Sequence, residues 1–143
     1  MKISEIMTSS VEIISADASV EQAAEKMRSL DVGMLPVYEG DRMIGTITDR
    51  DITIRVTAEG LDPTTTSVSE AMTEGVVHCR EDESIERAAE LMEERQIRRL
   101  VVVDEDNRPV GIVSLGDLAV RVHDDRLTGE VTERVSEPAK IRR

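Results

Sequence analysis

Aromatic side chains are almost absent from this chain of 143 residues, which has one tyrosine, Tyr38, and neither tryptophan nor phenylalanine. Proteins that bind single-stranded nucleic acid stack bases on aromatic rings, so the composition excludes that class. Positive charge is scarce as well, because 18 lysines and arginines stand against 30 acidic residues and give a formal net charge of −12. This balance has the wrong sign for coating a phosphate backbone. We expect no nucleic-acid partner.

Cysteine and long hydrophobic runs are also scarce. Cys79 is the single cysteine, so no disulfide can form within the chain, which suits a reducing compartment. No apolar run approaches membrane-spanning length, and the N-terminus has no apolar signal core. These features predict a cytoplasmic protein without a membrane partner. Hydrophobic residues still make up 39% of the chain and fall in periodic clusters, which predicts a folded protein.

An internal repeat organises the chain. Met7-Thr8 recurs as Met72-Thr73 at a spacing of 65, and one inserted residue then makes the spacing 66, so that Asp51 matches Asp117. Such agreement over about fifty positions indicates a tandem repeat. The repeat predicts four segments: a first repeat over 1–60, a linker over 61–71, a second repeat over 72–123 and a C-terminal tail over 124–143.

Each repeat has the pattern β-α-β-β-α, which predicts an α+β fold. Apolar residues at helical spacing predict amphipathic helices that begin at Val20 and Ile85, with Ser19 and Ser84 as N-caps. The predicted buried face of the first helix is Val20, Ala23, Ala24 and Met27. Apolar runs predict strands over 11–14, 35–38 and 43–48, and over 76–78, 100–103 and 110–114. Shorter helices are predicted to begin at Asp49 and Leu115.

The sequence gives little support to catalysis or metal binding. His78 and Cys79 are adjacent in a predicted strand, so their side chains point to opposite faces and cannot form a nucleophile–base pair. The acidic turn 104–107 superficially suggests a calcium loop, but Arg108-Pro109 breaks the ligand pattern. Motifs with zinc-ligand spacing are absent. We expect neither an enzyme nor a metal protein.

The repeated motifs resemble a known family. They are a Met-Thr opening, a Ser-Val/Ile-x-x-Ala-Ala-x-x-Met helix, a Leu-Pro-Val-Tyr or Leu-Val-Val-Val-Asp strand, and a closing Gly-x-Ile/Val-Thr/Ser-x-x-Asp. Together they are similar to the cystathionine-β-synthase (CBS) domain, and two in tandem resemble a Bateman module. The resemblance implies two CBS repeats packed with pseudo-twofold symmetry. It also implies a regulatory ligand that contains adenosine (AMP, ADP, ATP, S-adenosylmethionine or NAD(H)), with no cofactor required.

The family resemblance implies two nucleotide clefts between the repeats. The first would be lined by Thr48, Arg50, Asp51, Val76, Val77, His78, Ile97, Arg98 and Arg99. The second would be lined by Met7, Glu12, Ile13, Val32, Gly33, Met34, Ser114 and Asp117. A carboxylate can accept both hydrogens of a ribose cis-diol, while a hydroxyl and helix N-terminal amides can meet a phosphate.

The two implied clefts differ in charge. Three arginines are assigned to the first, at positions 50, 98 and 99, whereas the second has Gly116, Gly33 and Met34 at the matching positions and adds Glu12. Guanidinium groups suit phosphate oxygens. This difference predicts that the Asp51 cleft binds phosphorylated ligand more tightly.

Two functions remain open at this stage. One is a sensor that binds nucleotide and passes the signal to an unidentified partner protein. The other is a dimerisation or assembly module with vestigial clefts, in which Asp51 and Asp117 merely favour a helix start. Both imply a homodimer with an apolar helical face drawn from Ile52, Ile54, Val56, Leu118, Ala119 and Val122. In the tail, Leu127, Val131 and Val135 recur every four residues, which favours an amphipathic helix.

Overall fold

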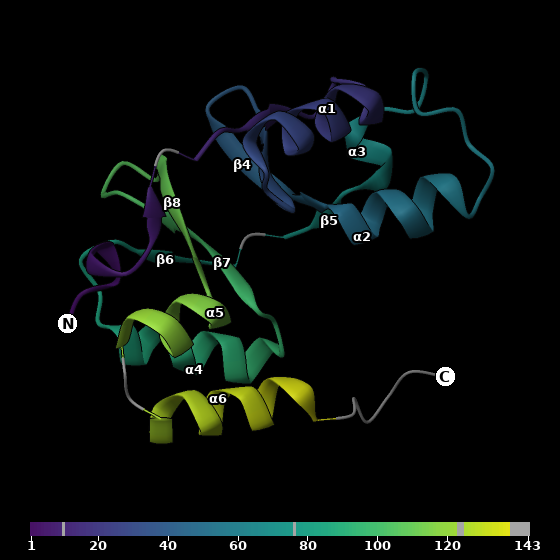
Figure 1. Ribbon diagram of the computed structural model, residues 1–143. Coiled ribbons are helices and arrows are strands. Elements are labelled where there is room, and N and C mark those ends of the chain that lie inside the picture. Colours follow the sequence, from purple (N-terminus) through teal and green to yellow (C-terminus); the bar gives the residue numbers. More distant parts are fainter. Residues whose placement is uncertain (10, 76, 123–124, 138–143) are drawn as a thin grey trace. The chain divides into compact units, whose positions relative to one another are not determined.

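The computed structural model describes residues 1–9, 11–75, 77–122 and 125–137 (Figure 1). The chain divides into two compact units. Unit 1 combines Met1–Val11 with Val77–Arg143, and unit 2 is Glu12–Val76. Each unit holds a four-stranded mixed sheet and several helices, which confirms the α+β class.

Unit 2 contains most of the first repeat. Its sheet has the order β2-β3-β4-β5, where β2 runs parallel to β3 and the other pairs are antiparallel. The strands are β2 (Ile14–Ser15), β3 (Met34–Glu39), β4 (Arg42–Thr48) and β5 (Thr73–Glu74). The helices are α1 (Val20–Leu30), α2 (Asp49–Ile52) with its π-helical continuation η2 (Thr53–Thr57), and α3 (Val68–Ala71).

Unit 1 repeats this plan with the second repeat. Its sheet has the order β1-β8-β7-β6. The strands are β1 (Thr8–Ser9), β6 (His78–Arg80), β7 (Arg99–Val103) and β8 (Pro109–Ser114). The helical elements are the 3-10 turn η1 (Ile3–Glu5), α4 (Ile85–Arg95), α5 (Leu115–Asp117), the π-helical turn η3 (Leu118–Val122) and α6 (Asp125–Ser136).

The opening segment of each repeat belongs to the unit that holds the body of the other repeat. The two segments, 2–9 and 67–74, share Ser-Glu-x-Met-Thr at a spacing of 65. In unit 1, β1 pairs with β8, and Ile3 and Ile6 are buried in the core around α4. In unit 2, β5 pairs with β4, and Val68 and Ala71 are buried in the core around α1. The repeats therefore exchange their first segments.

Helix capping follows the predicted serines, with one correction. The Ser19 Oγ accepts from the Gln22 N–H at 3.1 Å, and the Gln22 side chain accepts from the Ser19 N–H at 3.0 Å, which completes a capping box. Ser84 is the N-cap of α4, but its side chain makes no capping hydrogen bond in the described structure. Arg87 stands where a Glu or Gln would be needed, and an arginine cannot accept from the N-cap N–H.

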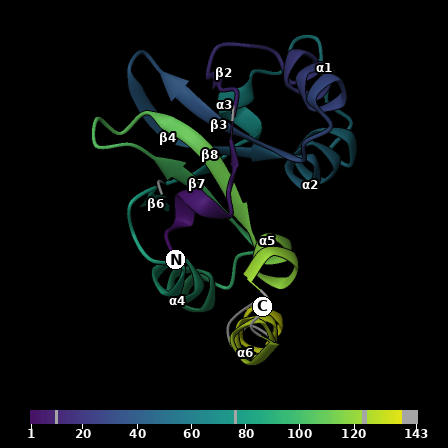
Figure 2. The same ribbon diagram turned by 60° about the vertical axis from the view of Figure 1, so that its left-hand side comes forward.

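Burial on the helix faces corrects several predictions. Ala24 is exposed, whereas its counterpart Ala89 is buried in a core that also contains residues of α6. Figures 1 and 2 both show α6 lying along α4, while α1 contacts α2 and α3. Val56 and Leu118, predicted for an exposed apolar face, lie in the cores of their own units. They cannot contribute to a dimer surface.

The leading strands start later than predicted. Residues 11–13 are irregular and the strand is Ile14–Ser15, and the second leading strand is His78–Arg80. The other predicted strands lie within β3, β4, β7 and β8, and the short helices begin at Asp49 and Leu115 as expected. A run of apolar residues marks a strand poorly at its edges, because loop residues can also be apolar.

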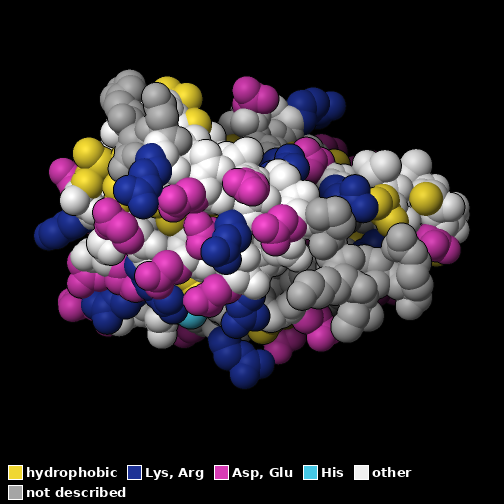
Figure 3. All heavy atoms as spheres, turned by 90° about the horizontal axis from the view of Figure 1, so that it is seen from below, with side chains coloured by type: hydrophobic (Ala, Val, Ile, Leu, Met, Phe, Trp, Pro, Cys, Tyr) yellow, Lys and Arg dark blue, Asp and Glu magenta, His cyan; other side chains and the backbone are white. Residues whose placement is uncertain are grey.

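The surface is densely charged. On the face drawn in Figure 3, acidic side chains are interspersed with Lys and Arg, and hydrophobic side chains form small patches. Within the described ranges, no helix combines the length and apolarity needed to cross a membrane.

Candidate functional site

The Thr-x-x-Asp motif of the first repeat forms a closed set of hydrogen bonds where β4 meets α2. The Thr48 N–H donates to Asp51 Oδ2 at 2.9 Å, and the Asp51 N–H donates to Thr48 Oγ1 at 3.1 Å. The other carboxylate oxygen, Oδ1, accepts from the Thr73 hydroxyl at 3.2 Å. Asp51 is 9% exposed. The carboxylate is thus held from two directions.

The Ser-x-x-Asp motif of the second repeat has the same geometry where β8 meets α5. The Ser114 N–H donates to Asp117 Oδ2 at 2.9 Å, and the Asp117 N–H donates to Ser114 Oγ at 3.1 Å. Asp117 Oδ1 lies 3.9 Å from Arg121 Nε, and its side chain is 15% exposed. Both aspartates therefore close helix-capping boxes, the structural role that the sequence already allowed.

Backbone amides at both motifs are already engaged. In unit 2, Asp49 N–H donates to the Gly33 carbonyl at 3.0 Å and Arg50 N–H to Asp49 Oδ1 at 2.9 Å. In unit 1, Leu115 N–H donates to the Arg98 carbonyl at 2.8 Å. A phosphate near either motif would therefore depend on cationic side chains more than on these amides.

Two arginines that sequence reasoning missed connect each motif to an exchanged segment. Arg55 donates through Nη1 to the Met72 carbonyl at 2.5 Å, and Arg121 donates through Nη1 to the Ile6 carbonyl at 3.2 Å. These arginines recur at the spacing of 66 that relates Asp51 to Asp117. The repeat comparison alone could have identified them.

The predicted site residues divide between the two units. Unit 2 holds Thr48, Arg50 and Asp51 of the first predicted cleft and Glu12, Ile13, Val32, Gly33 and Met34 of the second. Unit 1 holds Val77, His78, Ile97, Arg98 and Arg99 of the first and Met7, Ser114 and Asp117 of the second. Val76 lies outside the described residues. Within a unit, the structure brings Met34 opposite Thr48 and Arg99 opposite Ser114.

The predicted negative charge at Glu12 is already balanced. Its carboxylate lies 3.4 Å from Lys26 Nζ, and the same ammonium donates to the Ile13 carbonyl at 2.8 Å. This exposed pair ties the segment before β2 to α1. Glu12 is consequently a weaker deterrent to an anionic ligand than an unpaired carboxylate would be.

His78 and Cys79 lie in β6 and differ in their surroundings. Cys79 is buried in the unit 1 core, where its thiol donates to the Val101 carbonyl at 3.9 Å. Burial, with a further contribution from Glu83, raises the pKa of the Cys79 thiol to about 12. A neutral thiol is a poor nucleophile. His78 Nδ1 is buried and has no hydrogen-bond partner in the described part of the chain.

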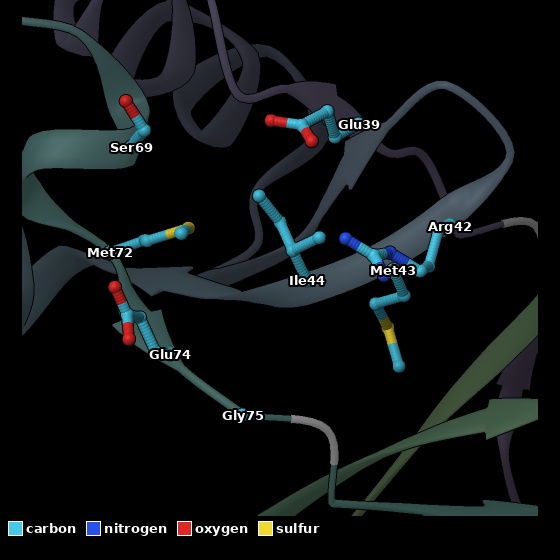
Figure 4. A pocket seen from close by; sticks show the side chains of 8 residues that line it. All are labelled: Glu39, Arg42, Met43, Ile44, Ser69, Met72, Glu74 and Gly75. Carbon is cyan, nitrogen blue, oxygen red and sulfur yellow. The ribbon is translucent and has the colours of Figure 1, made fainter.

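Unit 2 also contains a hollow of about 580 Å³ away from the Thr48–Asp51 motif. Figure 4 shows Met72 extending toward Ile44 of β4, with Glu39 and Glu74 on either side. The remaining lining residues are Arg42, Met43, Ser69 and Gly75. Two carboxylates and one guanidinium leave the hollow unsuited to a phosphate.

Metal ligands do not gather in the structure. No group of three or more His, Cys, Asp or Glu side chains among the described residues is placed to hold a metal ion. In the acidic turn, Asp104 Oδ1 accepts from the N–H groups of Asp106 and Arg108, at 2.9 and 3.0 Å. The carboxylate is thus occupied in shaping the hairpin turn.

Comparisons with known proteins agree with these repeated motifs. The CBS domain family model matches residues 3–57 and 68–124. The CBS domain-containing protein YhcV of Bacillus subtilis is 40% identical over 134 residues, which cover 94% of each chain.

Solved structures show the same fold. The crystal structure of Hypoxic Response Protein I with two coordinated zinc ions has a TM-score of 0.74 and 36% identity, over 85% of this chain and 98% of that one. The crystal structure of CBSX2 in complex with AMP has a TM-score of 0.70 and 26% identity, over 87% of this chain and 98% of that one. With two matched domains that span most of its length, the chain belongs to the CBS domain family as a tandem pair.

Proposed function

We propose that the protein is a regulatory module that binds an adenosine-containing nucleotide and passes the signal to a partner protein. The observation that carries the proposal is the recurrence of one fixed carboxylate with one fixed hydroxyl, at Asp51 with Thr48 and at Asp117 with Ser114. The relative of known structure that was crystallised with AMP supports this ligand class.

The chemistry of a fixed carboxylate suits a ribose. A carboxylate has about four lone-pair sites, and Asp51 uses two of them, one for the Thr48 N–H and one for the Thr73 hydroxyl. The remaining sites can accept the two hydrogens of a cis-diol. The Asp117 carboxylate uses one lone-pair site for the Ser114 N–H and has more such sites available. Capping the helix and binding a ribose are therefore compatible roles.

His78 offers a second polar contact for such a ligand. Buried polar atoms in proteins nearly always have a hydrogen-bond partner. We propose that the hydrogen-bond partner that His78 Nδ1 lacks is supplied by the bound ligand. In the first repeat, Ile13 occupies the matching position and cannot make this bond. The proposed cleft that contains His78 would gain a contact that the other lacks.

We expect the module to act as a homodimer, with exposed apolar side chains such as Ile54 as candidates for the contact. A dimeric assembly module without useful nucleotide binding is the alternative function. Sedimentation analysis measures the dimer in both cases, so only ligand binding separates the two functions.

The first test is thermal unfolding with and without AMP, ADP, ATP, S-adenosylmethionine or NADH. A ligand at about 100 times its Kd adds about 2.7 kcal/mol to the free energy of unfolding, which raises Tm by several degrees. We expect at least one of these ligands to raise Tm, each of Asp51→Ala and Asp117→Ala to reduce the rise, and the double variant to lose it.

A matched control separates ligand binding from helix capping, because losing either aspartate also costs about 1 kcal/mol of capping. The compared quantity is accordingly the ligand-induced change in Tm within each variant. Asp62→Ala provides the control, since Asp62 accepts from Thr64 in the segment that joins the repeats but belongs to neither motif. A well-folded dimer that no ligand stabilises would favour the assembly module.

A further inference from the structure

The hollow of unit 2 lies beside a part of β4 that is covered on one side only. β5 pairs with Gly45 and Thr46 of β4. Arg42 and Met43, at the start of β4, pair with β3 but, within the described residues, with no strand on the other side. An uncovered strand edge offers its unpaired N–H and C=O groups to another chain.

The matching edge of unit 1 carries a proline. β1 pairs with Gly111 and Ile112 of β8, so the start of β8 is left uncovered in the same way. Pro109 stands there in the place of Met43, since each pairs with the equivalent residue of the neighbouring strand. Both units have a shift of register beside this position, which therefore does not distinguish them. Proline has no N–H to donate, and it is one of the residues with which proteins block strand edges.

The hollow adds side-chain contacts to the edge of unit 2. Met72 extends from the exchanged segment toward Ile44 (Figure 4), and methionine adapts its shape to different apolar groups. Glu39, Arg42 and Glu74 line the same hollow, are exposed, and make no ion pair or side-chain hydrogen bond in the part of the chain that the structure describes. Two such carboxylates against one guanidinium favour a cationic side chain whose alkyl stem lies on the apolar floor.

We propose that the start of β4 and this hollow bind a short extended segment of a partner protein by strand addition, with a lysine or arginine of that segment between Glu39 and Glu74. In this mode of recognition, main-chain hydrogen bonds provide affinity and pockets for alternate side chains provide specificity. The inference rests on the proposed function, which requires a partner protein, and deepens it by naming the chemistry of the partner's segment. A second copy of this chain fits less well, because pairing two identical edges would bring like carboxylates together.

The first experiment titrates the isotopically labelled chain, without nucleotide, with a short peptide that alternates valine and lysine. We expect the amide signals of Ile44 and Glu74 to shift in a saturable way. A matched peptide that alternates valine and glutamate should bind far more weakly, because its charge has the wrong sign. A valine–lysine peptide with N-methylated valines should also bind far more weakly, because methylation removes the N–H groups of one edge and leaves the charge unchanged.

Variants of the chain test the edge and the carboxylates separately. Met43→Pro gives unit 2 the residue found at this edge in unit 1 and should abolish the response to the lysine peptide. Glu39→Gln combined with Glu74→Gln keeps the backbone edge, so it remains informative where proline disturbs the fold. It should weaken binding about two- to tenfold, the sum for two exposed ion pairs. The matched control combines Glu25→Gln with Glu59→Gln, which removes two exposed carboxylates of unit 2 outside the hollow and should leave the affinity unchanged.

The proposal is overturned if the lysine peptide does not bind, if the glutamate or N-methylated peptide binds as tightly, or if Met43→Pro leaves the response unchanged. It is also overturned if Met43→Pro lowers the dimer fraction in sedimentation, because a second copy would then occupy the edge. Since these titrations contain no nucleotide, they are independent of the thermal test. Peptide binding without any nucleotide-induced rise in Tm would reject the proposed ligand and retain the docking edge, and the reverse result would reject the edge alone.

Discussion

The buried thiol of Cys79 makes the stability of unit 1 depend on pH. Burial raises the pKa of its thiol to about 12 from the ordinary value of 9.0. Above pH 9 the unfolded chain loses this proton while the folded chain keeps it, so the thiol's contribution to stability is complete below pH 9 and declines as pH rises toward 12.

We therefore expect the Tm of the wild-type protein to fall more steeply above pH 9 than the Tm of Cys79→Val, which keeps an apolar side chain of similar size. Thermal scans of both proteins across this range provide the measurement, and every other titrating group is common to both. Parallel curves would show that the thiol is not buried as described. Iodoacetamide should also react slowly with the folded wild-type protein and rapidly after unfolding.

At the scale of residues, sequence predicts local contacts well and distant ones poorly. Spacing along the chain predicted Ser19 as an N-cap, and its capping box joins residues three apart, as do the boxes that the structure shows at Thr48 and Ser114. The hydrogen bond from Thr73 to Asp51 joins residues 22 apart and exists because β5 pairs with β4. No periodicity in the chain encodes that pairing. Ser84 shows the opposite failure: spacing predicts it as an N-cap, but its side chain makes no capping hydrogen bond, and the Arg87 side chain cannot accept the reciprocal bond of a capping box.

Among the elements, α6 distinguishes unit 1 from unit 2. It packs against α4, α5 and η3, and Val131 and Val135 enter the same core as Met92. Gln96, the residue that ends α4, donates to the Glu137 carbonyl at 3.0 Å. The helix therefore covers a face of the second repeat, and the residue that follows its C-terminal end is tied to α4.

Truncating Val131, which is 0% exposed, should lower the free energy of unfolding. Val131→Ala removes two buried methyl groups and leaves a small cavity, at a cost of about 2 kcal/mol. Chemical denaturation measures the loss. Glu133→Ala on the exposed side of the same helix should change stability by no more than about 0.5 kcal/mol. Equal effects of the two variants would mean that α6 does not pack on the core.

Element type was easier to predict than element role. The period of Val20, Ala23 and Met27 identified α1, and those residues are buried. The same period gave no sign that Ala24 would be exposed and Ala89 buried, because that difference comes from α6, which begins at Asp125, 36 residues after Ala89. Similarly, the apolar residues after Asp49 and Leu115 predicted helices correctly, but Val56 and Leu118 turned out to face their own cores.

At the scale of the whole molecule, the exchange of opening segments links the two repeats. Each unit lacks part of its core without a segment of the other repeat, which for unit 1 is residues 2–9 and for unit 2 is residues 67–74. The sequence showed two repeats but not this exchange, because a repeat defines which residues are equivalent and not which copy they contact. A unit of about fifty residues buries little surface alone, and the exchange enlarges both cores.

The exchange predicts that truncating a buried residue of either opening segment destabilises the unit that holds the body of the other repeat. One pair of equivalent residues tests this. Ile3 and Val68 are equivalent in the repeats, and both are 0% exposed. Ile3→Ala should destabilise unit 1, which holds the second repeat, by about 2–4 kcal/mol, whereas Val68→Ala should destabilise unit 2 by about 2 kcal/mol.

Amide hydrogen exchange measures the stability of the two units separately, because the free energy of local opening differs among parts of a structure. For Ile3→Ala, protection should fall most in β7 and β8, although Ile3 precedes the first repeat's own strands. For Val68→Ala, it should fall most in β3 and β4. If each variant instead lowered protection mainly in its own repeat, the opening segments would not be exchanged. If both variants lowered protection equally in all four strands, the two units would unfold as one cooperative unit.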